Sequence, residues 1–273
     1  MQHTSQRAII QALGVRNTFD ASAEIAQRKD FLKTYLQSAG MRSYVLGISG
    51  GIDSLTAALL AQSTVRELRA RGYDASFIAV RLPYGVQADE QDAQKAINVI
   101  EPDTLLTINI KPASDAAFEE LRRTSMDLGD ASRADYLLGN IKARQRMIAQ
   151  FAVAGAARGL VIGTDHAGEA LMGFFTKFGD GAADILPLSG LNKRRVRAVA
   201  EALGAPKELV YKVPTADLEN SAPLKPDEDA YGVTYDEIDD FLEGKRIAPA
   251  SEERILQAYR STAHKRALPF APV

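Results

Sequence analysis

Residues 49–54, Ser-Gly-Gly-Ile-Asp-Ser, combine hydroxyls, glycines and a carboxylate in a pattern that suits phosphate binding. The two glycines allow backbone amides to approach an anion closely, and a helix that follows directs its N-terminal amides at the same point. An aspartate in such a loop repels phosphate unless a cation intervenes, so we interpret Asp53 as a Mg²⁺ ligand. The alternative is that Asp53 or Ser54 only caps the helix.

A second acidic segment, residues 163–169, contains Asp165 and Glu169. These residues are four apart, so on a helical turn both would face the same way, and Glu169 could share Mg²⁺ with Asp53. The alternative is an exposed helix start, where the helix dipole favours acidic residues. The residues alone support both interpretations equally.

Residues 174–184 couple aromatic rings, a lysine, glycines and two carboxylates, a composition that suits a ring-bearing ligand with hydroxyls. Lys177 and Asp184 are the candidates for ligand contacts in this segment. Phe174 and Phe175 are better explained as members of an aromatic core cluster.

Basic residues lie at two further helical positions. In residues 140–146, a spacing of two is about 200° on a helix, so Lys142 and Arg144 cannot share a face. Asn140 and Arg144 form one ridge, Lys142 and Arg146 form the other, and at least one ridge is a solvated basic face. Lys193 begins a predicted helix, where a cation opposes the dipole, which hints at an anionic ligand. The alternative for Lys193 is again a solvated side chain.

Apolar runs that alternate with helical periodicity must position these residues. Strands are predicted at 44–48, 76–80, 104–110 and 160–163, and helices at 55–71, 89–100, 113–124 and 136–158. Strands that are apolar throughout indicate a parallel sheet covered by helices on both faces, and right-handed crossovers make it doubly wound. Ligands of such a sheet bind at its carboxyl edge, where residues 49–54 and 163–169 both fall.

The flanking segments differ from this core. Residues 1–42 are predicted to be helical, residues 205–232 contain Pro206, Pro214, Pro223 and Pro226 and are predicted to be a loop, and helices return at 235–242 and 251–265. The simplest organisation is one α/β domain over residues 1–273. It has a core sheet at about 43–204, a Pro-rich loop at about 205–232 and a helical tail at 233–273.

Composition excludes several classes of site and of partner. The 273 residues carry a formal net charge of −2, which argues against a nucleic-acid-binding protein. Without cysteine there is no disulfide, zinc ribbon, iron–sulfur cluster or thiolate nucleophile. The histidines His3, His166 and His264 form no short-range pair, which argues against a His-ligated metal. No apolar stretch spans a bilayer and no export signal is visible, so we expect a cytoplasmic protein without a membrane partner.

The Ser-Gly-Gly-x-Asp-Ser loop resembles the pyrophosphate loop of the N-type ATP pyrophosphatases, which cleave ATP to AMP and pyrophosphate while forming an adenylate. Within that class the chain is similar to the ammonia-dependent NAD synthetases. The similar segments span nearly the whole chain: residues 47–54, 81–85, 140–147, 163–169, 173–184, 214–219, 232–244 and 264–266. The segments Gly-Phe-Phe-Thr-Lys and Pro-Thr-Ala-Asp-Leu-Glu are specific to this family.

This resemblance implies a Rossmann-like fold of the adenine nucleotide alpha hydrolase type, with helical N- and C-terminal segments, and assigns the site residues. The implied ATP contacts are Gly47, Ile48, Ser49, Gly50, Gly51, Ile52, Asp53, Ser54, Arg81, Thr164, Lys193 and Thr215. Asp53 and Glu169 would hold Mg²⁺, and Asp53 and Lys193 would be catalytic. Deamido-NAD would bind across a homodimer interface, through Arg144, Lys177, Asp184, His264 and Lys265.

The implied reaction has two steps and uses ATP, deamido-NAD and ammonia. The nicotinate carboxylate attacks the α-phosphorus of ATP, and ammonia then displaces AMP to give NAD. Loop amides, Lys193 and Mg²⁺ would stabilise the leaving pyrophosphate. Asp180 or Asp165 would accept the proton from ammonia. Glutamine-dependent members add a glutaminase domain with a cysteine nucleophile, and this chain has neither the length nor a cysteine.

Two other functions compete with this one. Another adenylating enzyme of the class, such as a tRNA-modifying one, would share the phosphate loop, but its thiolation members use cysteines. A non-catalytic ATP-binding module would need neither two Mg²⁺ carboxylates nor a second-substrate segment. We also expect the Pro-rich loop, which carries Thr215, to close over ATP as a lid.

Overall fold

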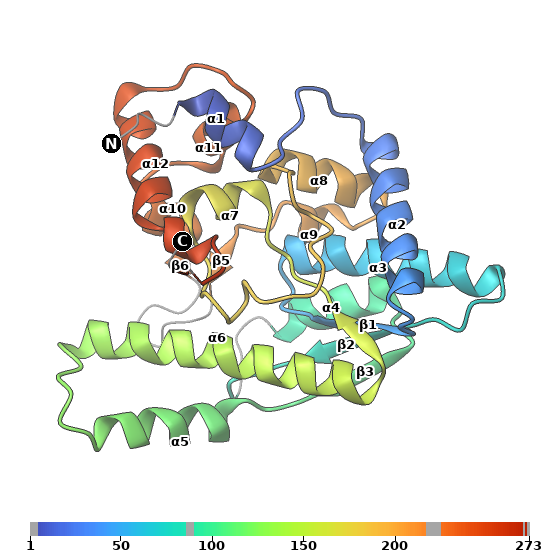
Figure 1. The fold of residues 1–273 in the computed structure, drawn as a ribbon, viewed down its shortest axis with the longest axis horizontal. Helices are drawn as coiled ribbons and strands as arrows, with labels where there is room; N and C mark the ends of the chain where they lie inside the picture. The colour runs from blue at the N-terminus through green and yellow to red at the C-terminus, as the bar shows by residue number, and fades with distance from the viewer. Residues whose placement is uncertain (1–4, 86–89, 217–224, 270, 272–273) are drawn as a thin grey trace.

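A computed structural model describes residues 5–85, 90–216, 225–269 and 271. Four strands form a parallel sheet in the order β3-β2-β1-β4 (Figure 1). The strands are β1 (Ser43–Gly47), β2 (Ser76–Arg81), β3 (Thr104–Thr107) and β4 (Gly159–Val161). This confirms the predicted fold class. Strand β3 ends three residues earlier than expected, because its partner β2 ends at Arg81 and Pro83 beyond it has no N–H to donate.

Helices cover both faces of this sheet (Figure 1). On one side lie α2 (Ala21–Ser38), α3 (Ile52–Ala70), α4 (Glu90–Ile100) and α8 (Lys193–Ala202), and on the other lie α5 (Lys111–Arg122) and α6 (Ala131–Ala156). Helix α6 begins five residues before the expected start, because the Asp130 carboxylate caps it by accepting from the Arg133 amide at 2.8 Å. Helix α3 begins at Ile52, which places Asp53 in its first turn.

The strand order reverses between β1 and β4. The chain passes from β1 through β2 to β3 in one direction, and α6 then returns it to β4 on the other side of β1. Connections that leave β1 and β4 therefore diverge, and a crevice opens between them at the carboxyl edge of the sheet. The predicted phosphate loop and residues 163–169 are the segments that follow these two strands.

Five helices form a second packed region, at the upper left of Figure 1. They are α1 (Gln6–Ala12), α7 (Ala167–Met172), α10 (Asp227–Tyr231), α11 (Tyr235–Leu242) and α12 (Pro249–Ser261), followed by the 3₁₀ turn η1 (Ala263–Lys265). Their apolar cluster includes Ile9, Leu171, Ile238, Phe241 and Ile255, all buried. Helix α11 has the predicted bounds, because Thr234 and Glu237 form a capping box at its start.

The prediction that residues 205–232 form an uninterrupted loop is wrong. This segment contains helix α9 (Lys207–Val210), helix α10 and a ribbon of β5 (Thr215–Ala216) with β6 (Lys225–Pro226). Pro206 and Pro226 each stand directly before a helix. A residue at that position does not donate a hydrogen bond within the helix, so the missing N–H of proline costs nothing there. Residues 217–224, which include the middle of the predicted lid and part of Pro-Thr-Ala-Asp-Leu-Glu, lie outside the described residues. In the described ranges, no helix combines the length and the apolarity needed to cross a membrane.

A tertiary contact fixes the start of α8. The Asp239 carboxylate on α11 accepts hydrogen bonds from the Lys193 amide at 3.0 Å and from the Arg194 amide at 2.7 Å. Asn192 caps the same helix by accepting from the Arg195 amide at 2.9 Å. Three amides that the helix itself leaves unpaired are thereby satisfied, and the position of Lys193 is set. Burial raises the pKa of Asp239 to about 6.

Asp239→Asn is expected to lower the free energy of unfolding by about 1–3 kcal/mol at pH 7.5, because the new NH₂ group leaves one amide of α8 without an acceptor. The measurement is urea denaturation. Asp236→Asn is the matched control, since Asp236 is exposed on the same helix and lies 3.4 Å from Arg194; its effect should stay within about 0.5 kcal/mol. Equal losses in the two variants would contradict the capping role.

The free energy of unfolding of the same two variants should depend differently on pH. The folded pKa of about 6 lies above the ordinary value of 3.8, so the folded state binds this proton more tightly than the unfolded state does. The resulting stability is present below the ordinary pKa and is lost as the pH rises through 6. Between pH 5 and 7.5 the wild type should lose about 1 kcal/mol from this group. The Asp239→Asn variant has no carboxyl group at this position, so its free energy of unfolding should not show this loss between pH 5 and 7.5.

Candidate active site

A cavity of about 530 Å³ opens at the strand-order reversal. Cavities of this size commonly bind small molecules. Residues from β1, the phosphate loop, β2, α6 and the segments around 163–182, 212–215 and 226–230 line it. Twelve of the predicted site residues meet there: Gly47, Ile48, Ser49, Gly51, Ile52, Asp53, Ser54, Arg81, Thr164, Glu169, Thr215 and Lys265.

The phosphate loop presents free amides at the start of α3. Its N-cap is Gly51, which has no side chain to accept them, so the alternative that Asp53 or Ser54 only caps the helix is wrong. Instead, the Ser49 hydroxyl accepts from the Gly51 amide at 3.1 Å, and the Ser54 hydroxyl donates to the Gly51 carbonyl at 3.0 Å. The serines hold the loop in shape and leave the first-turn amides available to an anion.

Gly50 is required by its surroundings. Its φ of +87° is a backbone conformation that other residues rarely adopt, and a Cβ atom there would lie 2.7 Å from the Ala93 amide nitrogen. The loop therefore packs directly on the first turns of α4. At Gly51 the nearest neighbour of such an atom is the Ser49 hydroxyl at 3.3 Å, which can rotate away.

A buried ion pair joins α3 to α8. The Lys193 ammonium lies 2.8 Å and 3.1 Å from the two carboxylate oxygens of Asp53, and the side chain of Lys193 is fully buried. The alternative that Lys193 is solvated is therefore wrong. Burial alone raises the pKa of Asp53, but the Lys193 ammonium holds it below its usual value. Burial likewise opposes the charge of Lys193, and Asp53 and Glu169 nevertheless raise the pKa of its ammonium.

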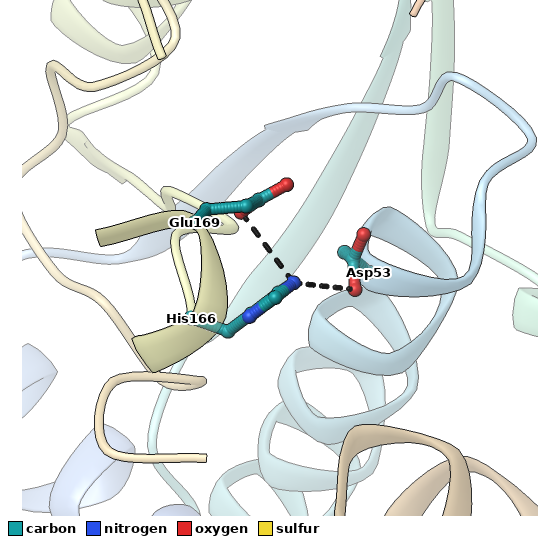
Figure 2. A group of neighbouring side chains, drawn as sticks. All are labelled: Asp53, His166 and Glu169. Atoms are coloured by element: carbon teal, nitrogen blue, oxygen red, sulfur yellow. Dashed lines mark ion pairs between the residues drawn. The ribbon is translucent and has the colours of Figure 1, made fainter. Parts of the chain in front are cut away.

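His166 lies between the two predicted Mg²⁺ ligands (Figure 2). Its Nε2 atom is 3.7 Å from an oxygen of Asp53 and 3.7 Å from an oxygen of Glu169, and its Nδ1 atom accepts from the Gly168 amide at 3.1 Å. Burial lowers the pKa of His166 to about 3, so the ring is neutral. The Nε2 atom also lies 3.3 Å from the Lys193 ammonium, so the ring contacts the ion pair as well as both carboxylates.

His166 was not identified as a site residue from the sequence, because only histidines that lie close to another histidine in the sequence were considered. The available signal was the spacing of three between His166 and Glu169, which places both on one face of a helical turn. The expected pairing of Asp165 with Glu169 on a helix is wrong. Helix α7 starts after its cap at His166, so Asp165 precedes the helix.

The acidic cluster fits a hard divalent cation. Asp53, His166 and Glu169 each offer one atom, and these atoms lie within 4.8 Å of one another. Two of these three atoms are carboxylate oxygens, which suit Mg²⁺. Burial raises the pKa of Glu169 well above its usual value, and Asp53 raises it further. A divalent cation would allow both carboxylates to ionise together.

Most of the predicted deamido-NAD residues form a chain of contacts outside the cavity lining. Lys265 lines the cavity and donates to the Gly173 and Phe175 carbonyls, both at 2.9 Å. Lys177 donates to the His264 carbonyl at 2.6 Å, and Arg144 donates to the Lys177 carbonyl at 3.3 Å.

Asp184 lies at the end of the sheet. Its carboxylate accepts from the Val161 amide at 2.7 Å, so in this structure it fastens the segment after the cavity to β4. Phe174, as expected, packs in an aromatic cluster, with its ring 4.8 Å from that of Tyr231, but Phe174 and Phe175 both also line the cavity.

Helix α6 presents a third face to the cavity, between the two predicted ridges. Asn140, Ala143, Arg146 and Gln150 line the cavity at spacings of three and four. Arg144 is exposed at one side of this face, and Lys142 is buried at the other, with its ammonium 4.2 Å from the centre of the Tyr84 ring. Only pairs of residues four apart were considered from the sequence, so this face, which lies between the two pairs, was not identified.

Gln150 and Asp227 are further cavity residues that sequence reasoning did not single out. The Gln150 side chain accepts from the Gly47 amide at 2.6 Å, which holds the end of β1. Asp227 is buried and accepts from the Tyr235 hydroxyl at 2.9 Å. Neither residue belongs to a recognisable local pattern, so no sequence signal was available.

The chain is similar to known proteins over nearly its whole length. The sequence model of the NAD synthase family matches residues 24–269. An NH(3)-dependent NAD(+) synthetase from Burkholderia lata is 63% identical over 265 residues, which cover 97% of this chain and 94% of that protein. The solved NAD+ synthetase from Burkholderia pseudomallei has a TM-score of 0.84 and 57% identity, over 97% of this chain and 96% of its own. An NMN synthetase from Francisella tularensis has a TM-score of 0.81 and 36% identity, over 93% and 99%.

Gly50→Ala is expected to damage the phosphate loop far more than Gly51→Ala. The added methyl group at position 50 meets the backbone of α4 at 2.7 Å in a strained conformation, whereas at position 51 it meets a side-chain hydroxyl. We expect Gly50→Ala to lower the free energy of unfolding by about 1–3 kcal/mol and Gly51→Ala by less than about 1 kcal/mol. Thermal and urea denaturation of both variants measure this, and the reverse order of stability would refute the packing argument.

Proposed function

The chain belongs to the NAD synthase family, and from this membership and the cavity we propose that it catalyses the ATP-dependent amidation of deamido-NAD by ammonia. The products are NAD, AMP and pyrophosphate, so the enzyme is a ligase that forms a carbon–nitrogen bond. One observation carries this function: the phosphate loop, Asp53 and Glu169 line the same cavity, and the buried Lys193 lies against Asp53.

The first step needs positive charge where pyrophosphate leaves. The nicotinate carboxylate attacks the α-phosphorus of ATP, and the leaving pyrophosphate takes the electrons of the broken P–O bond. The free amides of α3 and the Lys193 ammonium are fixed before the reaction, so they stabilise this charge without reorganisation. Asp53 holds Lys193 in place through their ion pair at 2.8 Å. These contacts support the proposed catalytic roles of Asp53 and Lys193.

Asp53 and Glu169 are the proposed ligands of Mg²⁺. When bound, the ion supplies charge that neutralises the departing pyrophosphate. His166 lies between Asp53 and Glu169, with its Nε2 atom 3.7 Å from an oxygen of each carboxylate. The ATP contacts proposed at Arg81, Thr164 and Thr215 agree with their place in the cavity wall.

The second step consumes ammonia. Ammonia attacks the carbonyl carbon of the adenylate, AMP leaves, and one proton must be removed from nitrogen. Of the two predicted acceptors, Asp180 lines the cavity and is held by the Thr176 amide at 2.9 Å. Asp165 does not appear in the cavity wall, although burial raises its pKa to about 7. Asp180 is therefore the proposed proton acceptor.

Deamido-NAD is proposed to contact Arg144, Lys177, Asp184, His264 and Lys265, in a site completed by a second subunit. The contacts from Arg144 through Lys177 to His264 join α6 to η1 beside the cavity. Helix α6 also exposes the apolar side chains of Tyr136 and Ile148, which a homodimer partner would cover. The single-domain organisation and the cytoplasmic location stay predictions.

Wild-type enzyme should release pyrophosphate from ATP only when deamido-NAD is present, and should form NAD with ammonium salts but not with glutamine. The chain has no cysteine to release ammonia from glutamine. The measurements are pyrophosphate release and NAD formation with each nitrogen source. Nicotinate mononucleotide is the rival substrate, because an NMN synthetase is among the similar structures.

Each other result has a definite meaning. Amidation of the mononucleotide in place of deamido-NAD would replace the proposed substrate. Pyrophosphate release that depends on tRNA would favour another adenylating enzyme, and ATP binding without any release would favour a binding module. Glutamine-driven turnover by the purified chain would overturn the argument from cysteine.

Asp53→Asn and Arg144→Ala should affect different kinetic parameters. The first removes charge that holds Lys193 and Mg²⁺, so kcat should fall by roughly 10²–10³-fold. The second removes a cation proposed to bind deamido-NAD equally in ground and transition states, so the KM for deamido-NAD should rise roughly ten- to a hundred-fold with little change in kcat. Steady-state assays over each substrate test both. A raised KM in Lys142→Ala but not in Arg144→Ala would show that we chose the wrong side of α6.

A further inference from the structure

Four cationic side chains of the described residues line the cavity: Arg81, Arg146, Lys212 and Lys265. Three of them donate to backbone carbonyls, Arg81 to Ile48, Arg146 to Leu82 and Lys265 to Gly173 and Phe175. Arg81 and Lys212 also pair with carboxylates, Arg81 with Glu90 at 2.7 Å and Lys212 with Asp92 at 2.8 Å. They differ in exposure, because the Arg81 side chain is only 4% exposed whereas that of Lys212 is 24% exposed. The resemblance and the comparisons assign no role to Lys212.

The partner of Lys212 stands beside the phosphate loop. Asp92 lies in the first turn of α4, and a Cβ atom on Gly50 would lie 3.1 Å from its carbonyl carbon. The ion pair therefore places the Lys212 ammonium next to the loop that receives phosphate. Thr215, another cavity residue, follows on the same segment.

This ion pair is exchangeable. The side chain of Lys212 is 24% exposed and that of Asp92 is 33% exposed, so water screens the attraction. A lysine presents a compact charge with three donors on a flexible stem, which can turn from one anion to another. A triphosphate carries more negative charge than one carboxylate and accepts several charge-assisted hydrogen bonds.

We propose that Lys212 is a further ATP-binding residue, which exchanges the Asp92 carboxylate for the outer phosphates of ATP. In this role the Asp92 carboxylate pairs with the Lys212 ammonium when no polyphosphate is bound. Asp92 therefore competes with ATP for the same ammonium. The inference rests on the proposed function only in that ATP is the ligand of this cavity. It predicts opposite consequences for the loss of the two partners.

The experiment measures equilibrium binding of ATP and AMP by calorimetry, with Mg²⁺ and without deamido-NAD. Lys212→Ala and Lys212→Gln should each weaken ATP binding roughly ten-fold, the equivalent of about 1.4 kcal/mol, and leave AMP binding unchanged. Asp92→Asn should bind ATP at least as tightly as the wild type, because a competing negative charge is gone. Lys207→Ala is the matched control, since Lys207 is an exposed lysine on the neighbouring helix α9 and should change nothing.

Two results would overturn the inference. If Asp92→Asn weakens ATP binding as much as Lys212→Ala does, the ion pair only positions the segment. If both Lys212 variants, folded by thermal denaturation, bind ATP like the wild type, Lys212 does not contact the phosphates. Binding and amidation are measured separately, so a chain that binds ATP through Lys212 but forms no NAD would refute the proposed function and leave this inference standing.

Discussion

A buried lysine must share one crevice with half-buried carboxylates, and much of the structure stabilises this arrangement. Lys193 is fully enclosed, and an ammonium removed from water is tolerated only with a close partner of opposite charge. Asp53 supplies that partner from α3, at the other side of the strand-order reversal. Removal of one member of such a pair typically costs about 3–5 kcal/mol, because the other charge is left buried and alone. The ion pair therefore links the placement of two helices to the chemistry of the site.

The neighbours of the pair are arranged around the same constraint. Asp239 and Asn192 fix the first turn of α8 and so fix where Lys193 enters the crevice. His166 stays neutral because burial lowers its pKa to about 3, which spares the crevice a second positive charge. Glu169 remains the carboxyl whose pKa is raised well above its usual value. A divalent cation bound beside Asp53 and Glu169 would offset the repulsion between these two carboxylates.

The cavity is built from both sides of the sheet. Helix α3 brings the phosphate loop, which Gly50 allows to pack against α4, and helix α6 brings a face that also holds the ends of β1 and β2. Gln150 accepts from the Gly47 amide and Arg146 donates to the Leu82 carbonyl, so side chains of one helix set the spacing of two strand ends. Helix α6 therefore both lines the cavity and fixes the positions of the two strand ends beside it. Changes on the inner face of α6 therefore affect binding through geometry as well as through contact.

The sequence by itself determined the parallel sheet and placed residues 49–54 and 163–169 at the same edge of it, because these features depend on local patterns. Apolar runs, glycine and serine spacing, and a capping box act over a few residues, and α11 has its predicted bounds for that reason. Only the tertiary structure decided that Lys193 is buried, that His166 stands between Asp53 and Glu169, and which face of α6 meets the cavity. It also turned Pro206 and Pro226 into helix starts within an expected loop. Burial and charge pairing depend on which distant segments come into contact, as Asp53 and Lys193 do. The spacing of residues along the chain does not predict such contacts.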